Sequence, residues 1–102
     1  MIGRWALVSV FSFALWGCVA PLPIEEYTIA RAAVSAAKES GAERLAPGLW
    51  HKADENYRKA VQSLEDKDNE AAKLNFLRAI ENAEKAENFA RLKKFESGEV
   101  VQ

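Results

Sequence analysis

The chain has 102 residues, with 14 basic and 15 acidic side chains, a formal net charge of −1 and a single cysteine. This length supports one small domain, and the even balance of charge argues against a nucleic-acid-binding protein, which would carry a clustered basic face. Because one cysteine excludes an internal disulfide, the domain must be held together by packing.

The N-terminus has the pattern of a cleavable signal peptide. A short start with one basic residue precedes an apolar run from Trp5 to Trp16, which only Ser9 and Ser12 interrupt. As a helix, about a dozen residues span roughly 18 Å, well short of the ~30 Å hydrocarbon layer. The pattern therefore predicts a signal peptide over residues 1–17 rather than a permanent transmembrane helix.

The end of this run, Leu15-Trp16-Gly17-Cys18, resembles a bacterial lipobox. The resemblance implies that the Cys18 thiol receives a diacylglycerol, that the signal is cut before Cys18, and that the new amino group is acylated. Trp16 departs from the pattern, which usually has a smaller residue at that position. The alternative is an ordinary signal peptide followed by a free or buried cysteine.

A lipid on Cys18 is the only covalent group that we expect, and no other cofactor is predicted. Two acyl chains are enough for stable membrane anchoring, whereas one chain binds only marginally. The residue after the cysteine is Val19. In the enteric pattern an aspartate there retains lipoproteins at the inner membrane, so the resemblance implies an outer-membrane anchor with the domain on the periplasmic face. In a host with one membrane, the expected place is its outer surface.

Residues 18–23 are predicted to form a lipidated tether, and residues 24–97 to form an alanine-rich helical domain. Pro21 and Pro23 favour extended backbone in the tether, and Pro23 is suited to the first turn of a helix. The following chain is rich in Ala, Glu and Lys and poor in glycine, which favours helix. The expected fold is all-α, with three helices in an antiparallel arrangement.

The first helix is predicted from Ile24 to Ser40. Its apolar residues at helical spacing form one narrow stripe: Tyr27, Ala30, Val34 and Ala37. Gly41 is suited to the left-handed conformation that ends many helices. Residues 42–46 are expected to form the connection to the next helix, and residues 43–45 have the composition for one further turn.

Pro47 is predicted to open the second helix, because its missing N–H costs nothing in the first turn. Apolar residues spaced alternately three and four apart give a seam for packing on another helix: Trp50, Ala53, Tyr57, Ala60 and Leu64. On the exposed side, Asp54 with Arg58 and Glu55 with Lys59 stand four apart in the favourable order. The second helix should therefore bury one face and keep the other in water.

The polar segment 66–69 contains helix-capping residues and is predicted to start the third helix, which runs to about Glu96 with Gly98 beyond. A first stripe consists of Ala72, Phe76, Ala79, Ala83, Ala86 and Ala90. Five larger apolar residues, Leu74, Leu77, Phe89, Leu92 and Phe95, lie elsewhere around the helix. A helix that is apolar on more than one side needs more than one neighbour. Either the first helix or another protein is expected to cover the second side.

An internal repeat links the second and third helices. Residues 53–61 and 72–80 share the order Ala, Asn, aromatic, basic, Ala and a β-branched residue. Across an antiparallel hairpin the two aromatic residues, Tyr57 and Phe76, would face each other, with alanines that let the helix axes approach. We interpret the repeat as packing rather than as a ligand site.

The region 40–47, followed by Ala53, Tyr57 and Ala60, resembles an alanine-rich bacterial family known as domain of unknown function 4398. Its members carry a Gly-Ala and Ala-Pro signature between helices, here Gly41-Ala42 and Ala46-Pro47. The resemblance covers most of residues 24–95. It implies a helical domain that is commonly part of a lipoprotein. The helix pair is also similar to a single tetratricopeptide unit, although one pair is too short for a repeat array.

The sequence offers little for catalysis. His51 is the only histidine, and its nearest acids, Asp54 and Glu55, make a weak ligand set, so we expect a solvated side chain and no metal site. Trp50 is expected in the core rather than in a binding site. No glycine-rich phosphate loop, nucleophile elbow or zinc-protease spacing occurs. We therefore predict that the protein is not an enzyme.

The sequence predicts a small membrane-anchored envelope protein with a structural or adaptor role in the periplasm. Phe89, Leu92 and Phe95 are the candidate contacts for another envelope protein or a second copy. The alternative is a conventionally secreted periplasmic accessory or ligand-binding protein built on a tetratricopeptide-like hairpin.

Overall fold

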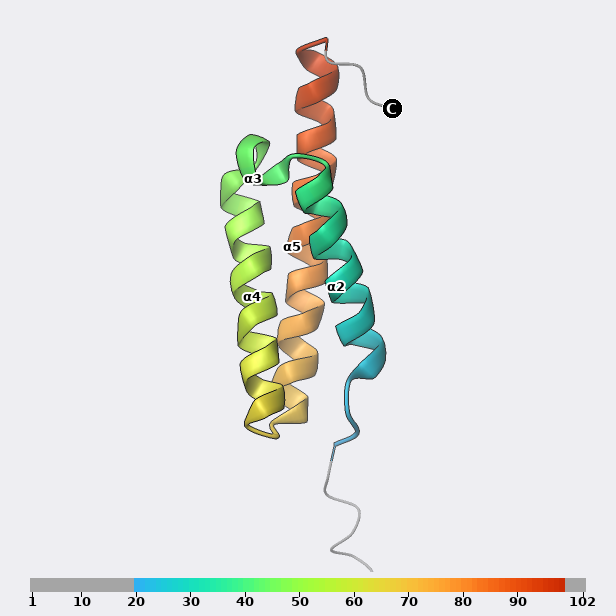
Figure 1. Cartoon of the computed structure of the whole chain (residues 1–102), viewed down its shortest axis with the longest axis vertical. Helices are drawn as coiled ribbons and strands as arrows, with labels where there is room; N and C mark the ends of the chain where they lie inside the picture. The colour runs from blue at the N-terminus through green and yellow to red at the C-terminus, as the bar shows by residue number, and fades with distance from the viewer. Residues whose placement is uncertain (1–19, 99–102) are drawn as a thin grey trace, which may run out of the picture.

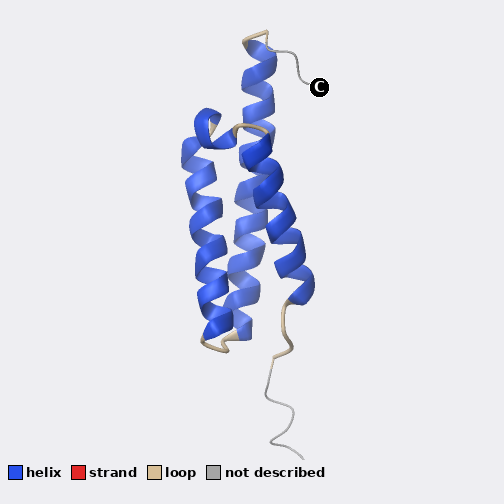
Figure 2. Ribbon diagram, viewed as in Figure 1, coloured by secondary structure: helices blue, strands red, loops and turns tan. Residues whose placement is uncertain are grey.

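The computed structural model describes residues 20–98 and places four helices in this part of the chain (Figure 1): α2 at Ile24–Glu39, α3 at Ala42–Leu45, α4 at Pro47–Glu65 and α5 at Asn69–Glu96. No strand occurs between residues 20 and 98 (Figure 2), so the predicted all-α fold is confirmed. The predicted signal peptide over residues 1–17 and the predicted lipidation motif that ends at Cys18 lie outside the described residues.

The three long helices run up, down and up. The antiparallel pair α4 and α5 forms the closest hairpin, as predicted, and α2 packs mainly on α5 and much less on α4. In Figure 1 the end of α5 projects beyond α3 and the start of α4. The α4–α5 turn and the chain that enters α2 share the opposite end of the bundle. The fold therefore has a base, where the tether enters, and a far end made by α5.

The helix boundaries follow local signals in the sequence. Gly41 ends α2 with a left-handed φ of 84°, and Pro47 is the first residue of α4. The Asp68 carboxylate caps α5 by accepting the Ala71 N–H at 3.1 Å. Pro23 differs from the prediction, because it occupies the cap position before α2 and not its first turn, and its carbonyl accepts the Tyr27 N–H at 2.9 Å.

Two glycines at the top of the bundle are expected to respond in opposite ways to alanine. Gly41→Ala should lower the free energy of unfolding by ~1–2 kcal/mol, because a Cβ is strained at a left-handed φ. Gly48 lies in the first turn of α4, and apart from its chain neighbours and the adjacent backbone of the same helix nothing lies within 4 Å of an added Cβ. Gly48→Ala should therefore raise the stability by about 0.4–1 kcal/mol. Urea unfolding followed by circular dichroism measures both changes, and equal effects would contradict this account.

The core is built mostly from alanine. Among the described residues the completely buried side chains are Ala30, Ala37, Ala42, Ala53, Ala60, Ala72, Phe76, Ala79, Ala83, Ala86 and Ala90. Small side chains on the facing stripes let the helix axes come close, so dispersion contacts between backbones and side chains replace bulky packing. Trp50, only 7% exposed, fills the upper half of the core, as predicted.

The lower half of the core contains an aromatic cluster to which each long helix contributes one ring. Phe76 of α5 packs edge-on against Tyr27 of α2, with ring centroids 5.4 Å apart, and against Tyr57 of α4, at 5.8 Å. Tyr27 and Tyr57 stack at 6.4 Å. The internal repeat is thus a packing device, because its two aromatic residues meet across the hairpin.

Candidate interaction surface

The helix α5 is apolar on two opposite faces. At about 100° per residue, the buried stripe from Ala72 to Ala90 points toward α2 and α4. Leu74 and Leu92 stand on the other side, where 49% and 53% of their surface is exposed. They are 18 residues apart, which is about five full turns, so they lie on one line along the helix. Neither α2 nor α4 covers this face. The sequence left open whether the first helix would cover the second apolar side of α5, and the structure shows that it does not.

The three residues predicted to contact a partner lie at the far end of this face. Phe89 and Leu92 line a shallow groove together with Leu49 from α4, Lys85 and Asn88. The Lys93 ammonium lies 4.9 Å from the centre of the Phe89 ring. Phe95 is one turn further along the projecting part of α5 and is 79% exposed. The structure thus joins Phe89 and Leu92 in one groove and leaves Phe95 beyond it.

A charged segment separates the two apolar ends of the α5 face. Lys85 forms an ion pair with Glu81 at 2.9 Å, and both side chains are about 60% exposed. The hydrogen bond from Lys85 and its charge hold the pKa of Glu81 below its usual value. Along its length, the outward face of α5 is therefore first apolar, then charged and then apolar again. We call this strip, defined by Leu74, Leu77, Glu81, Lys85, Phe89, Leu92 and Phe95, the α5 strip.

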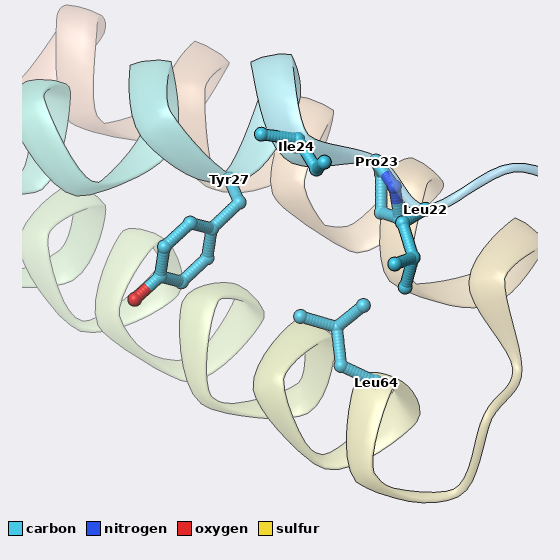
Figure 3. A pocket seen from close by; sticks show the side chains of 5 residues that line it. All are labelled: Leu22, Pro23, Ile24, Tyr27 and Leu64. Carbon is cyan, nitrogen blue, oxygen red and sulfur yellow. The ribbon is translucent and has the colours of Figure 1, made fainter.

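The sequence did not reveal a second apolar feature, a hollow at the base of the bundle. Leu22, Pro23, Ile24 and Tyr27 line it together with Leu64 near the end of α4, and its volume is about 120 Å³. Leu22 and Leu64 point toward each other across it (Figure 3). The sequence feature that could have indicated this hollow is the pair Leu22 and Ile24, which are large apolar residues on either side of Pro23 in a segment otherwise typical of a tether.

The tether is fixed to the domain next to this hollow. The Asn69 side-chain amide, at the start of α5, donates a hydrogen bond to the Ala20 carbonyl at 3.0 Å. Pro23 is buried, while Leu22 and Ile24 are exposed by 62% and 68%. Ala20, whose carbonyl accepts this hydrogen bond, comes two residues after Cys18 in the sequence.

The residues considered for chemistry do not converge. His51 is exposed in the first turns of α4. The nearby acids have basic partners instead: Asp54 pairs with Arg58 and Glu55 with Lys59, each at 3.1 Å, as the spacing predicted. Within residues 20–98 no group of three or more His, Cys, Asp or Glu side chains has the geometry to hold a metal ion.

The tyrosine hydroxyls belong to the core cluster rather than to a reactive site. Burial raises the pKa of Tyr57, and the neighbouring Tyr27 hydroxyl raises it further. A tyrosine is neutral at pH 7 in any case, and the raised pKa extends the range in which the Tyr57 phenol stays neutral, which suits a structural role. None of the helices between residues 20 and 98 combines the length and apolar character needed to span a bilayer.

Comparison with known proteins identifies the family. The model of the family described as "Domain of unknown function (DUF4398)" matches residues 25–98, and the chain belongs to this family. No curated protein and no solved structure matches the chain. The match spans all four helices of the described fold, so the family unit and the packed bundle coincide.

Proposed function

We propose that this member of the family is a small lipoprotein of the bacterial cell envelope, anchored through Cys18, whose helical domain is a protein-interaction module without catalysis. In this proposal the domain sits on the periplasmic face of the outer membrane. The lipid places the module at the membrane, and the α5 strip is the surface that it presents.

The observation that carries the interaction role is the α5 strip. Five large apolar side chains remain 44–79% exposed on one helix of a domain whose own core is complete: Leu74, Leu77, Phe89, Leu92 and Phe95. These side chains form two exposed apolar ends on either side of the Glu81–Lys85 pair, and exposed apolar patches of this kind mark sites of protein contact. Phenylalanine and leucine on a rigid helix are suitable anchors, because they lose little conformational freedom on binding.

The form of the surface favours a protein partner over a small molecule. Small-molecule sites are concave and have volumes of about 300–1,000 Å³, with a few convergent polar groups. The apolar hollow at the base holds only about 120 Å³ and is lined by no charged side chain. The groove at the far end of the α5 strip has a volume of about 380 Å³, but it is shallow and is continuous with the exposed face of a helix of 28 residues. A helix face of this kind fits another helix better than it fits a ligand.

The anchor proposal is supported by the Leu15–Cys18 motif and by the position of the base. Three chain segments meet at the base: the tether, the end of α4 and the start of α5 (Figure 1). Because Asn69 holds Ala20 against the domain, lipid on Cys18 would keep this end close to the membrane. The far end of α5, with Phe89 and Phe95, is then the end most distant from the anchor.

A second candidate is a conventionally secreted periplasmic accessory protein with a tetratricopeptide-like hairpin. The observation in its favour is the apolar hollow around Leu22 and Leu64, which could accept part of a small apolar ligand. The two proposals differ in the fate of Cys18, which is lipidated in the first and unmodified in the second.

Cys18→Ser separates the two proposals in cells. The wild-type chain is expected in the outer-membrane fraction as the shortened mature form. The Cys18→Ser chain should lose that location and keep the full precursor length, because the modified cysteine is required for cleavage. Val19→Ala is the matched control and should behave as wild type. Processing of Cys18→Ser with an unchanged outer-membrane amount, measured by fractionation and immunoblot, would refute the lipid anchor.

A further inference from the structure

The α5 strip is nearly symmetric about Ala83, which lies near the middle of the helix. Leu74 and Leu92 lie nine residues before and after Ala83, and Glu81 and Lys85 lie two residues before and after it. When the strip is inverted about Ala83, Leu74 takes the position of Leu92, and Glu81 takes the position of Lys85. A surface with this pattern is complementary to an inverted copy of itself.

An antiparallel pair of α5 helices would bring these matched positions together. With Ala83 as the centre, Leu74 of one copy meets Leu92 of the second copy, and Glu81 meets Lys85 of the second copy. Both contacts occur twice, because a two-fold interface is isologous. The next layers set Arg78 beside Asn88 of the second copy. These positions (74, 78, 81, 85, 88 and 92) are spaced alternately four and three apart, as along a coiled-coil seam, but only the two ends of this seam are apolar and its middle is polar.

We propose that two copies of this chain associate through the α5 strip as an antiparallel two-fold dimer with Leu74 against Leu92 and Glu81 against Lys85. This inference rests on the interaction role proposed for the strip, and it is independent of the lipid on Cys18. In this proposal the α5 strip binds a second copy of the chain.

The charges select the antiparallel arrangement. In a parallel pair, Glu81 would stand beside Glu81 and Lys85 beside Lys85 of the second copy, and like charges at facing positions are destabilising. In the antiparallel pair, Glu81 of each copy faces Lys85 of the other copy, so both central contacts join opposite charges. Both side chains are about 60% exposed in the single chain, so they are available to a second copy.

The neighbouring helices leave room for this arrangement. Lys73 reaches Glu26 of α2 at 3.8 Å, so α2 flanks one edge of the α5 strip. Phe89 shares a groove with Leu49 of α4, so α4 flanks the other edge. A two-fold axis perpendicular to α5 keeps both α2 helices on one side of the dimer. Both tethers then leave from that side, at opposite ends, which allows two anchors to enter the same membrane.

The size of the strip sets the expected strength of the dimer. Residues 71–95 span about 36 Å of helix, and a helix with its side chains is about 10–12 Å wide. Such a strip covers about 400 Å² on each partner, half of the roughly 800 Å² that a standard specific interface buries. We therefore expect a weak, reversible dimer whose population depends on the protein concentration.

Disulfide trapping in the full chain tests the arrangement. In a Cys18→Ser background, Leu74→Cys together with Leu92→Cys should give a covalent dimer when the purified protein in detergent is oxidised with copper phenanthroline. The two new thiols cannot join within one chain, because they are about 27 Å apart. Leu74→Cys alone and Leu92→Cys alone are the controls and should remain monomeric. Efficient dimerisation of a single variant would indicate a parallel pair and overturn the proposal, as would a monomeric double variant.

Charge reversal tests the central layers in the same trapping background. Glu81→Lys or Lys85→Glu should each reduce the yield of trapped dimer about tenfold, because both central layers become repulsive. The exchange Glu81→Lys/Lys85→Glu should restore the yield, and a mixture of the two single reversals should also trap dimers. Circular dichroism confirms that each variant is folded. If the exchange stays as low as the single reversals, or if no reversal changes the yield, the proposed register is wrong.

Discussion

Phe76→Ala should lower the free energy of unfolding by ~3–5 kcal/mol, the largest change expected from a single substitution in the domain. Phe76 is completely buried and is the largest side chain with no exposed surface. Its ring is the centre of the aromatic cluster, and both edge-on contacts, to Tyr27 and Tyr57, depend on it. The two tyrosine rings are carried by α2 and α4, and the completely buried neighbours in this cluster are alanines, which are too short to fill the space, so a cavity should persist.

The expected loss is a large part of the stability of such a domain. Natural domains are typically stable by about 5–15 kcal/mol, and small ones lie near the lower limit. Phe76→Ala should therefore shift the urea midpoint strongly and leave a measurable unfolded fraction at room temperature. Unfolding followed by circular dichroism at 222 nm measures the change directly.

Phe95→Ala provides the matched control, because it removes the same atoms from the same helix. Phe95 is 79% exposed on the projecting end of α5 and packs in neither core cluster. Its replacement should change the stability by less than about 0.5 kcal/mol. If Phe76→Ala and Phe95→Ala have similar effects, the aromatic cluster does not organise the core in the way described.

Local signals in the sequence predicted three helix boundaries correctly, because each of them has a local cause. Gly41 adopts the left-handed conformation, Pro47 starts α4, and Asp68 caps α5. The seam of α4 and the alanine stripe of α5 are periodic, so their pairing in a hairpin followed from spacing alone. The ion pairs of Asp54 and Glu55 on α4 followed in the same way.

Other features depend on how segments far apart in the sequence meet. The docking of the tether needs Asn69 beside Ala20, a contact across 49 residues that no local pattern reports. The hollow at the base likewise joins Leu22 to Leu64. Because both faces of α5 are apolar, the sequence could not decide whether the first helix covers the second face or leaves it open. The position of α2, fixed in part by Glu26 against Lys73, decides which face is left exposed.

The second large effect concerns Cys18, on which the proposed location depends. A diacylglyceryl group and an N-linked acyl chain together supply three chains, and each buried methylene contributes about 0.8 kcal/mol to membrane binding. One chain would give only marginal, reversible binding, whereas two or more give stable anchoring. The proposed lipid would thus decide whether the α5 strip is confined to a membrane or diffuses freely. Trp16 is the residue of the motif that departs from the usual pattern, so chemical evidence for the modification is decisive.

The mass of the N-terminal peptide of the membrane-extracted protein is the most direct test of the proposed anchor. Trypsin should release a peptide that begins at Cys18 and ends at Arg31, with added mass for one diacylglyceryl group and one further acyl chain. Mild base should remove the two ester-linked chains and leave the amide-linked one. A peptide with an unmodified Cys18 thiol, or a mature chain that begins at another residue, would contradict the lipid anchor.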